Sequence, residues 1–391
     1  MTTPLYTLDP EPAAAWAPFS GCRPLSELRV GAWLIRERWE GATETECAAL
    51  LVPSMLGAFV DDRTVPEVRA VGPIGGPAII GLSTFAPSGE HVGDLPAELT
   101  SFANDGEVVG WWVPPGHEWS PGAGATATVE IHGISIVGAW DILSATEQFL
   151  PADTADFARH PGDEIPDGSI VIGDPGDVVL LGSRVEPNVV FDTRGGPIVL
   201  QSDSYVKGGT RFEGPVYVGP DTQILGGLIK NSAIGPRCKL HGEIQSSVFV
   251  GYANKVHDGF VGHSVLGRWV NLGAGTTTSN LKNTYGPVRL QVGEERIDTG
   301  LPNVGTMFGD HAKVAIGTYF DTGTIIGTGA NVFGSSRPPK YVPPFAWGMS
   351  GDRMTKEGFL ATAERVMPRR KIEFTDPVRQ HLSALYDYAT S

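Results

Sequence analysis

The stretch LQSDSYVKGGTRFEGPVYVGPDTQI (200–224) carries an aliphatic or aromatic residue at every sixth position, and so does FGDHAKVAIGTYFDTGTIIGTGANV (308–332). This period fits neither an amphipathic helix nor an alternating strand. A fixed six-residue repeat is typical of a parallel β-helix, in which each hexad forms one side of a triangular coil. The sequence therefore predicts a left-handed parallel β-helix over residues 169–335, with the repeated apolar residues filling its interior.

Between these stretches, two series of apolar residues are spaced 16 residues apart: Ile234, Val250 and Leu266, and Leu240, Val256 and Leu272. This spacing predicts coils of 16 residues in the middle of the β-helix. Stacked coils place equivalent residues about 4.8 Å apart, the distance between neighbouring strands. On this register His257 lies directly over His241 of the preceding coil, and Gly273 of the next coil leaves space beside His257.

Residues 1–155 lack the six-residue period, and we predict that they form a separate domain. Apolar runs such as PAIIGLSTF (77–85) predict strands, and VGAWLIRERWEG (30–41) predicts a helix. We therefore expect an α+β domain. The segment LPADTADFARHPGDEIPDG (150–168) combines a short helical pattern with Pro and Gly, which is typical of a linker to the β-helix.

Two further segments depart from the repeat. Residues 276–306 break the period and must loop out of the β-helix, and loops of that length in compact domains are usually functional. Residues 336–391 form a tail that opens with an extended Pro-rich strip. The tail continues with two predicted helices, KEGFLATAERVM (356–367) and PVRQHLSALYDYA (377–389).

Composition narrows the classes of partner. The formal net charge of −15 argues against nucleic acid or an anionic membrane as a partner. No apolar stretch is long enough to span a membrane, and the N-terminal segment shows no signal-peptide pattern. Cys22, Cys47 and Cys238 form no CxxC pair, so neither structural zinc nor a disulfide framework is expected. These features predict a cytoplasmic protein.

The segment HDGFVGHSVLGRWVNLGAGTTTSNLKN (257–283) closely resembles a known family. It is similar to the acetyltransferase domain of the bifunctional N-acetylglucosamine-1-phosphate uridyltransferase / glucosamine-1-phosphate acetyltransferase. The similarity is greater still to the shorter alternative bacterial and archaeal group. CRPLSELRVGAWLIRERWEG (22–41) looks like the start of that group's reduced nucleotidyltransferase domain. GDHAKVAIGTYFDTGTIIG (309–327) and PPKYVPPFAWG (338–348) look like its later coils, so the resemblance spans nearly the whole chain.

The resemblance implies an acetyl-CoA-dependent N-acetyltransferase that acts on an amino-sugar phosphate such as glucosamine 1-phosphate. Its general base corresponds to His257, its companion catalytic Asn to Asn271, and a further substrate-positioning Asn to Asn280. The chemistry suits these residue types. An imidazole with a pKa near neutrality can accept the proton of a sugar amine, and an amide can hold a sugar hydroxyl without adding charge.

Two departures concern the acceptor sugar. Gln245 stands where the family has its substrate-phosphate Lys, and Phe260 stands where it has a Tyr. A phosphate would then need other cations, and four lysines are nearest in sequence: Lys230, Lys239, Lys255 and Lys282. The family binds the phosphates of CoA at its terminal coils. On this resemblance the candidate donor-binding residues are Gly273, Ala274, His311, Arg337 and Lys340.

The N-terminal domain carries a second candidate activity, uridylyl transfer from UTP. Such an enzyme needs a Gly-rich loop with a basic residue for the triphosphate, and an Asp for Mg²⁺. The glycine loop is missing here, while Arg23, Arg29 and Asp105 are candidate nucleotide-binding residues. Mg²⁺ is therefore expected only if this domain is active.

Two other readings stay open. His241, His257 and His263 are the only histidines that could form the zinc site of a β-helix carbonic anhydrase, and their spacing does not match that family. The chain could also be a non-catalytic module that binds a sugar nucleotide or acts as a scaffold. The resemblance further implies a homotrimer with active sites between neighbouring prisms.

Overall fold

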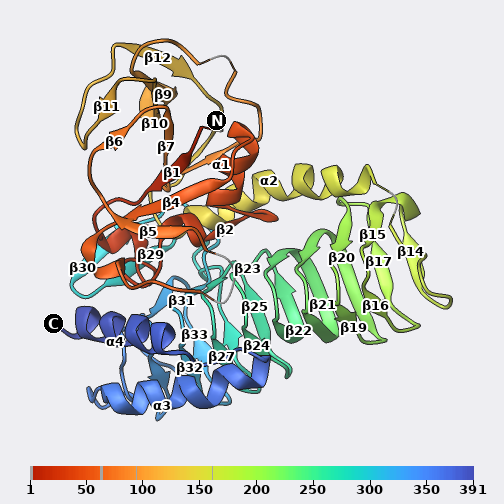
Figure 1. Cartoon of the computed structure of the whole chain (residues 1–391). Helices are drawn as coiled ribbons and strands as arrows, with labels where there is room; N and C mark the ends of the chain where they lie inside the picture. Colours follow the sequence, from red (N-terminus) through yellow and green to blue (C-terminus); the bar gives the residue numbers. More distant parts are fainter. Residues whose placement is uncertain (1–2, 62–64, 94, 161) are drawn as a thin grey trace.

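The structure is a computed structural model that describes residues 3–61, 65–93, 95–160 and 162–391. An N-terminal α+β domain lies over one half of a long β-solenoid, and two C-terminal helices pack beside the later coils (Figure 1). The predicted parallel β-helix is confirmed, because 19 strands form one continuous parallel sheet that winds from residue 170 to residue 342.

The N-terminal domain is built on a seven-stranded mixed sheet in the order β12-β9-β10-β7-β1-β4-β5. The expected strand in the run 77–85 is β7, and the expected helix in the run 30–41 is α1. The elements of this domain are β1 Leu5–Leu8, η1 Ala14–Trp16, η2 Leu25–Glu27, β2 Arg29–Val30, β3 Trp33–Leu34, α1 Ile35–Thr43, β4 Cys47–Val52, η3 Ser54–Leu56, β5 Glu67–Ala70, β6 Ile74–Gly75, β7 Ala78–Leu82, β8 Phe85–Pro87, β9 Thr100–Asn104, β10 Glu107–Val113, β11 Glu118–Trp119, β12 Ala127–Glu130 and β13 Gly133–Ser135.

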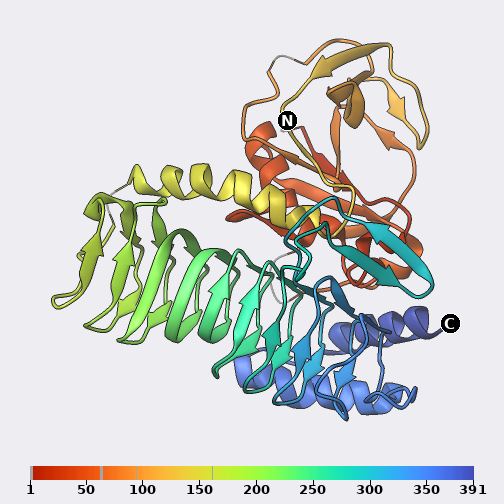
Figure 2. The same cartoon turned by 180° about the vertical axis from the view of Figure 1, so that it is seen from behind.

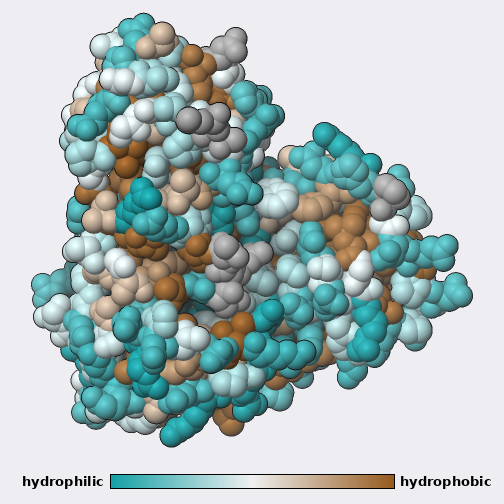
Figure 3. Space-filling model, viewed as in Figure 1, coloured by the Kyte–Doolittle hydropathy of each residue, from teal (hydrophilic) through white to brown (hydrophobic). Residues whose placement is uncertain are grey.

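The first half of the segment expected to be a linker, residues 150–158, belongs to a long helix, α2 Asp141–Ala158, that starts before the predicted stretch. The helix begins where Asp141 accepts hydrogen bonds from the backbone of Val137 and Gly138. It lies along the solenoid, where Leu150 packs with Tyr217 in an apolar cluster (Figure 2). Figure 3 shows apolar surface where α2 meets the first coils.

The solenoid has three faces. Face A contains β14 Ile170–Ile172, β17 Val190–Asp192, the first part of β20 Thr210–Val218, the middle of β21 Gln223–Ile234, the second part of β22 Lys239–Gln245, β25 Phe260–Gly262, β28 Thr277–Thr278 and β33 Tyr319–Phe320. Face B contains β15 Val178–Leu180, β18 Ile198–Leu200, the ends of β20 and β21, β23 Val248–Phe249, β26 Val265–Leu266, β31 Thr306–Phe308, β34 Thr324–Ile326 and β36 Tyr341–Val342. Face C contains β16 Arg184–Val185, β19 Tyr205–Val206, the starts of β21 and β22, β24 Asn254–Lys255, β27 Asn271–Leu272, β32 Lys313–Val314 and β35 Asn331–Val332.

The register of the middle coils differs from the one expected. On face B, Ile234 pairs with Phe249 and Phe249 with Leu266, so the first of these coils is one residue shorter than expected and the second is one residue longer. On face C, Leu240 pairs with Lys255. Val250, predicted to be interior, instead joins the apolar cluster of the N-terminal domain. The predicted register was wrong because it assumed that every interior position holds an apolar residue, whereas Lys255 occupies the interior position that pairs with Leu240.

The predicted loop contains a two-stranded hairpin, β29 Arg289–Val292 and β30 Glu295–Asp298, which contacts β34 of the solenoid and shares an apolar cluster with the N-terminal domain (Figure 2). The repeat resumes without a shift, since Leu266 pairs with Phe308 across the insertion. The tail forms the two expected helices, α3 Lys356–Val366 and α4 Asp376–Thr390, with the short helix η5 Met367–Arg370 between them; η4 Pro175–Asp177 lies in the first coil. Phe345 of the Pro-rich strip, Phe359 of α3 and Leu385 of α4 share one apolar cluster.

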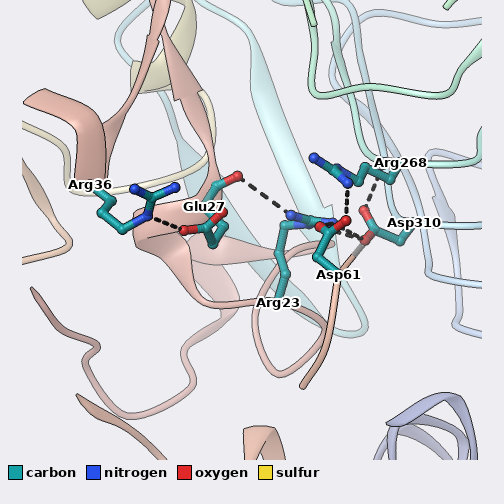
Figure 4. Close-up of polar contacts among 6 residues, drawn as sticks. All are labelled: Arg23, Glu27, Arg36, Asp61, Arg268 and Asp310. Carbon is teal, nitrogen blue, oxygen red and sulfur yellow. Dashed lines mark hydrogen bonds and ion pairs between the residues drawn. The ribbon is translucent and has the colours of Figure 1, made fainter. Parts of the chain in front are cut away.

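A buried group of four charged residues joins the N-terminal domain to the solenoid: Arg23, Asp61, Arg268 and Asp310 (Figure 4). Arg23 donates from Nε (3.0 Å) and Nη2 (2.8 Å) to Oδ2 of Asp310. Asp61 pairs with Arg268, and the other oxygen of Asp310 accepts the backbone N–H of Arg268 at 2.9 Å. Alternating charges therefore neutralise one another where water is excluded.

This interface gives the first prediction. Arg23→Met leaves the buried Asp310 carboxylate without its two guanidinium bonds, and breaking one partner of a buried ion pair costs about 3–5 kcal/mol. We expect a clear loss of unfolding free energy, measured by urea denaturation with tryptophan fluorescence. Arg69→Met is the control, because its ion pair with Glu67 is exposed to water and contributes little to stability. Equal urea midpoints for the two variants would contradict the proposed role of the cluster.

Candidate functional site

His257 lies at the corner between faces C and A, where β24 turns into β25, and its side chain is exposed. The observed register changes one of its neighbours. The pairing has an offset of 15 residues before the corner, from Leu240 to Lys255, and of 17 after it, from Glu243 to Phe260, so His241 lies at the equivalent corner of the preceding coil. Because Asn254 pairs with Asn271, Ala274 rather than Gly273 comes beside His257 in the next coil. The small neighbour that was expected is still present, so the imidazole is open to a ligand.

His241 and Asp258 flank this corner. Nδ1 of His241 lies 3.3 Å from Oδ1 of Asp258, although the two groups lack hydrogen-bond geometry. The ring of His241 covers Gly226, since a Cβ on that glycine would lie 3.0 Å from Cδ2 of the ring. His241 is thus packed against the preceding coil, whereas His257 is exposed.

Lys255 lies inside the prism and is 1% exposed. Its Nζ donates to the backbone carbonyls of His241 (2.8 Å) and His257 (2.7 Å), so it ties two successive corners together. Burial lowers the Lys255 pKa to about 8, partly offset by the nearby charge of Asp258. Lys255, expected at a substrate phosphate, instead directs its buried ammonium to two backbone carbonyls.

Asn271 lies on face C, away from the corner that carries His257. Its Oδ1 accepts from Nδ2 of Asn254 at 2.9 Å, and Oδ1 of Asn254 accepts from Nη2 of Arg370 at 3.0 Å. Lys239 faces the same side, and its pKa is lowered by burial and by the charges of Arg370 and Arg369. This amide ladder docks the C-terminal segment, and no sequence pattern had indicated the part that Arg370 plays in it.

Asn280 lies at the opposite corner of face A, next to His263. Its Nδ2 is 2.7 Å from Nδ1 of His263, and a Cβ added to Gly262 would fall 2.9 Å from the same amide. Burial lowers the pKa of His263, with Glu147 of α2 acting in the opposite direction, so this ring is neutral at pH 7. The predicted trio of His257, Asn271 and Asn280 therefore occupies three separate places within one chain.

A cavity of about 690 Å³ lies between α2 and the corner of faces A and B. His263, Ser246 and Asn231 line it from three successive coils, and Lys230 lies beside Asn231. Gln245 does not line it but pairs in register with Lys230 on face A. We call this cavity the α2 cleft. Sequence reasoning missed His263, because its contact with Asn280 spans 17 residues, one more than the coil length expected from the sequence.

The expected donor-binding residues divide into exposed and buried groups. Burial is the main cause that lowers the pKa of Lys340, and the positive charge of Lys282 lowers it further. These two cations therefore lie near each other. Arg337 is exposed on the strip that follows the last coils. His311 is only 8% exposed and lies between the rings of Trp269 and Phe359, with its pKa well lowered by burial. His311 is therefore enclosed in the junction with α3.

In the N-terminal domain, the candidate nucleotide-binding arginines are buried in contacts with the solenoid. Arg23 holds Asp310, and the guanidinium of Arg29 lies 5.3 Å from the ring centre of Tyr217 while Nη1 donates to the carbonyl of Ala32. Asp105 is exposed in the tight turn between β9 and β10, with a left-handed φ of 52°. Among the described residues, no group of three or more His, Cys, Asp or Glu is placed to hold a metal ion.

Comparisons with known proteins identify distant homologues of this chain. It is 28% identical over 184 residues to a "Bifunctional sugar-1-phosphate nucleotidylyltransferase/acetyltransferase" of Sulfurisphaera tokodaii, covering 41% of this chain and 44% of that protein. It is 25% identical over 178 residues to the "Bifunctional protein GlmU" of Methanococcus aeolicus, covering 40% and 41%, and 27% identical over 101 residues to that of Methanocaldococcus jannaschii, covering 26% and 24%. The chain thus spans less than half the length of these relatives. No family model matches it.

The resemblance to bifunctional nucleotidyltransferase/acetyltransferase proteins is therefore confirmed as distant homology. No helix in the described part of the chain has the length and apolar character needed to cross a membrane.

The buried Lys255 gives the second prediction. Its ordinary pKa of 10.5 is lowered to about 8, so between these pH values the unfolded chain binds a proton that the native state has lost. The contribution of Lys255 to the free energy of unfolding must therefore rise with pH. We expect the wild-type value minus that of Lys255→Met to increase by up to about 3 kcal/mol over this window, measured by urea denaturation. Leu240→Met, a neutral change in the same interior column, should give a constant difference, and a constant difference for Lys255→Met would contradict the assignment.

Proposed function

We propose that this protein is an acetyl-CoA-dependent N-acetyltransferase whose acceptor is an amino-sugar phosphate of the glucosamine 1-phosphate type. Distant homology to acetyltransferase-containing proteins supports the reaction class, and a parallel β-helix is consistent with an acyltransferase. The observation that carries the proposal is the exposed imidazole of His257 at an open corner, tied in place through its backbone by Lys255. Such a reaction would serve UDP-N-acetylglucosamine and cell-envelope sugar synthesis.

The reaction follows from general-base chemistry. His257 accepts a proton from the sugar amine as the nitrogen attacks the thioester carbonyl of acetyl-CoA. The tetrahedral intermediate collapses with cleavage of the C–S bond, and the imidazolium protonates the departing thiolate. The products are the N-acetylated sugar phosphate and free CoA thiol, and His257 returns to its neutral form.

The donor and the assembly are also part of the proposal. We assign the CoA phosphates to the neighbouring cations Lys282 and Lys340 and to Arg337, with the backbone near Gly273 and Ala274 beside the acetyl group. In the described residues α2 covers face B and α3 lies beside face C, whereas face A carries no helix. A homotrimer through this face would bring His257 of one chain near Asn280 of another, since these residues lie at the two edges of face A, whereas Asn271 stays on face C. A light-scattering mass near 41.5 kDa would exclude it.

Uridylyl transfer by the N-terminal domain is the alternative, supported by the names of the homologues. Within this domain, Arg23 and Arg29 are committed to contacts with the solenoid. Pyrophosphate release from UTP and a sugar 1-phosphate in the presence of Mg²⁺ would establish this activity. If both activities are absent while the ligand still binds, the protein is a non-catalytic sugar-nucleotide module. The buried free thiols Cys22, Cys47 and Cys238 fit the proposed cytoplasmic location.

His257→Ala gives the third prediction. We expect thiol release from acetyl-CoA with glucosamine 1-phosphate to fall by a factor on the order of 10²–10⁴, the usual contribution of a general base. The assay follows free thiol with a chromogenic disulfide. His241→Ala is the matched control, since that ring lies at the equivalent corner of the preceding coil but is packed on Gly226. Full activity in His257→Ala would remove the proposed base, and equal losses in both variants would point to corner structure instead.

A further inference from the structure

We infer that a basic patch at the C-terminal end of α3 is a docking surface for an acidic segment of a partner protein. The patch consists of five cations from two distant parts of the chain: Arg237, Lys239, Arg369, Arg370 and Lys371. It lies where α3 leads into η5 beside β24 (Figure 1). Arg237 stands at the corner of faces B and C, so the patch is separate from His257, which lies at the corner of faces C and A.

The two halves of the patch are joined by hydrogen bonds. Nη1 of Arg237 donates to the backbone carbonyl of Arg370 at 3.4 Å, and Nη2 of Arg370 donates to Oδ1 of Asn254 at 3.0 Å. The ring centre of Tyr252 lies 6.0 Å from Cζ of Arg237, and Tyr252 shares an apolar cluster with Met367 of η5. The backbone that carries the cations is therefore fixed before a partner binds, which lowers the entropic cost of binding.

The charges of the patch are not balanced within the protein. Burial is the main cause that lowers the pKa of Lys239, and the positive charges of Arg370 and Arg369 lower it further. Burial likewise lowers the pKa of Arg370, and the charge of Arg369 adds to the shift. Among the described residues, no carboxylate offsets either shift. These like charges repel one another, so an approaching anion relieves their repulsion as well as forming contacts of its own.

The patch also has fewer hydrogen-bond acceptors than its donors require. In the described part of the chain, Asp221 is the carboxylate that pairs with the patch, at 3.2 Å from Nε of Arg237. Arg369 and Lys371 are exposed, and neither forms an ion pair with a described residue. Nε of Arg370 is enclosed without an acceptor. Carboxylates of a partner can pair with the exposed Arg369 and Lys371, and such charge-assisted hydrogen bonds are stronger than neutral ones.

The surroundings of the patch favour a protein segment over a small free anion. Ile372 and Phe374 follow the patch in sequence and are half-buried, and the guanidinium of Arg379 lies 4.8 Å from the ring centre of Phe374. Arginine beside aromatic side chains is typical of protein interfaces, and arginine clusters recognise acidic motifs. A partner can therefore use apolar contacts next to its carboxylates.

The charge of the whole chain argues for a short acidic segment and against nucleic acid. The formal net charge is −15, so a long polyanion that extends beyond the patch meets an acidic surface. Charges are screened beyond about 8 Å at physiological ionic strength. A short acidic segment therefore responds mainly to the patch itself.

Fluorescence anisotropy tests the surface with a short fluorescein-labelled peptide in which glutamates are interspersed with leucines. We expect this peptide to bind the wild-type protein, and less tightly as salt is raised. The double variant Arg369→Gln/Lys371→Gln should lose about tenfold or more in affinity through loss of two charged contacts. Both side chains are exposed, so the fold should be retained, which circular dichroism would check. Arg159→Gln/Lys207→Gln is the matched control, because it removes an exposed arginine and an exposed lysine outside the patch and changes the net charge equally.

The other arms identify the occupant of the patch. A peptide with Gln in place of every Glu should not bind, and equal binding of the two peptides, or equal losses in the two double variants, would overturn the inference. So would inorganic phosphate that binds in calorimetry where the acidic peptide does not, because the patch would then be a small-anion site. A light-scattering mass that rises with protein concentration only while Arg369 and Lys371 are present would make a second copy the occupant and also overturn it. Acetyl transfer should be unchanged in Arg369→Gln/Lys371→Gln, so the docking surface and the proposed function fail independently.

Discussion

The narrow interior of the prism is the constraint on which the rest of this structure depends. Backbone hydrogen bonds hold successive coils about 4.8 Å apart, and each face contributes buried side chains such as Ile234, Phe249 and Leu266 to a continuous stack. Coils of unequal length must then absorb their differences at the corners. The corners hold His257 and His263, so the packing that keeps the faces regular also confines the chemistry to the edges of the prism.

The fold could be predicted from sequence because the six-residue period reports interior packing directly. The detailed register could not, since Lys255 occupies an interior position that a search for apolar residues skips. Its aliphatic chain lies in the core column while its ammonium bonds two carbonyls. A one-residue error in register was enough to put Gly273 rather than Ala274 beside His257. The pairing of His263 with Asn280 was missed for the same reason, because it depends on the length of one coil.

The N-terminal domain shows how the use of a residue type depends on its surroundings. From the sequence, Arg23 and Arg29 were candidates for binding a triphosphate. In the structure both arginines contact the solenoid instead, Arg23 at Asp310 and Arg29 at the ring of Tyr217. Nothing local to residues 22–41 distinguishes these two uses, because the partners lie far away in the chain, within the solenoid. The same holds for α2, whose apolar side is explained only by the face of the solenoid that it covers.

The hairpin formed by β29 and β30 shows that the solenoid tolerates a long excursion of the chain without losing register, since Leu266 and Phe308 pair across it. The entropic cost of closing such a loop grows only slowly with its length. The turn at Gly293 and Glu294 is exposed, although the base of the hairpin is packed. This turn is thus a suitable insertion site for a folded domain, because the coils on either side can continue to stack.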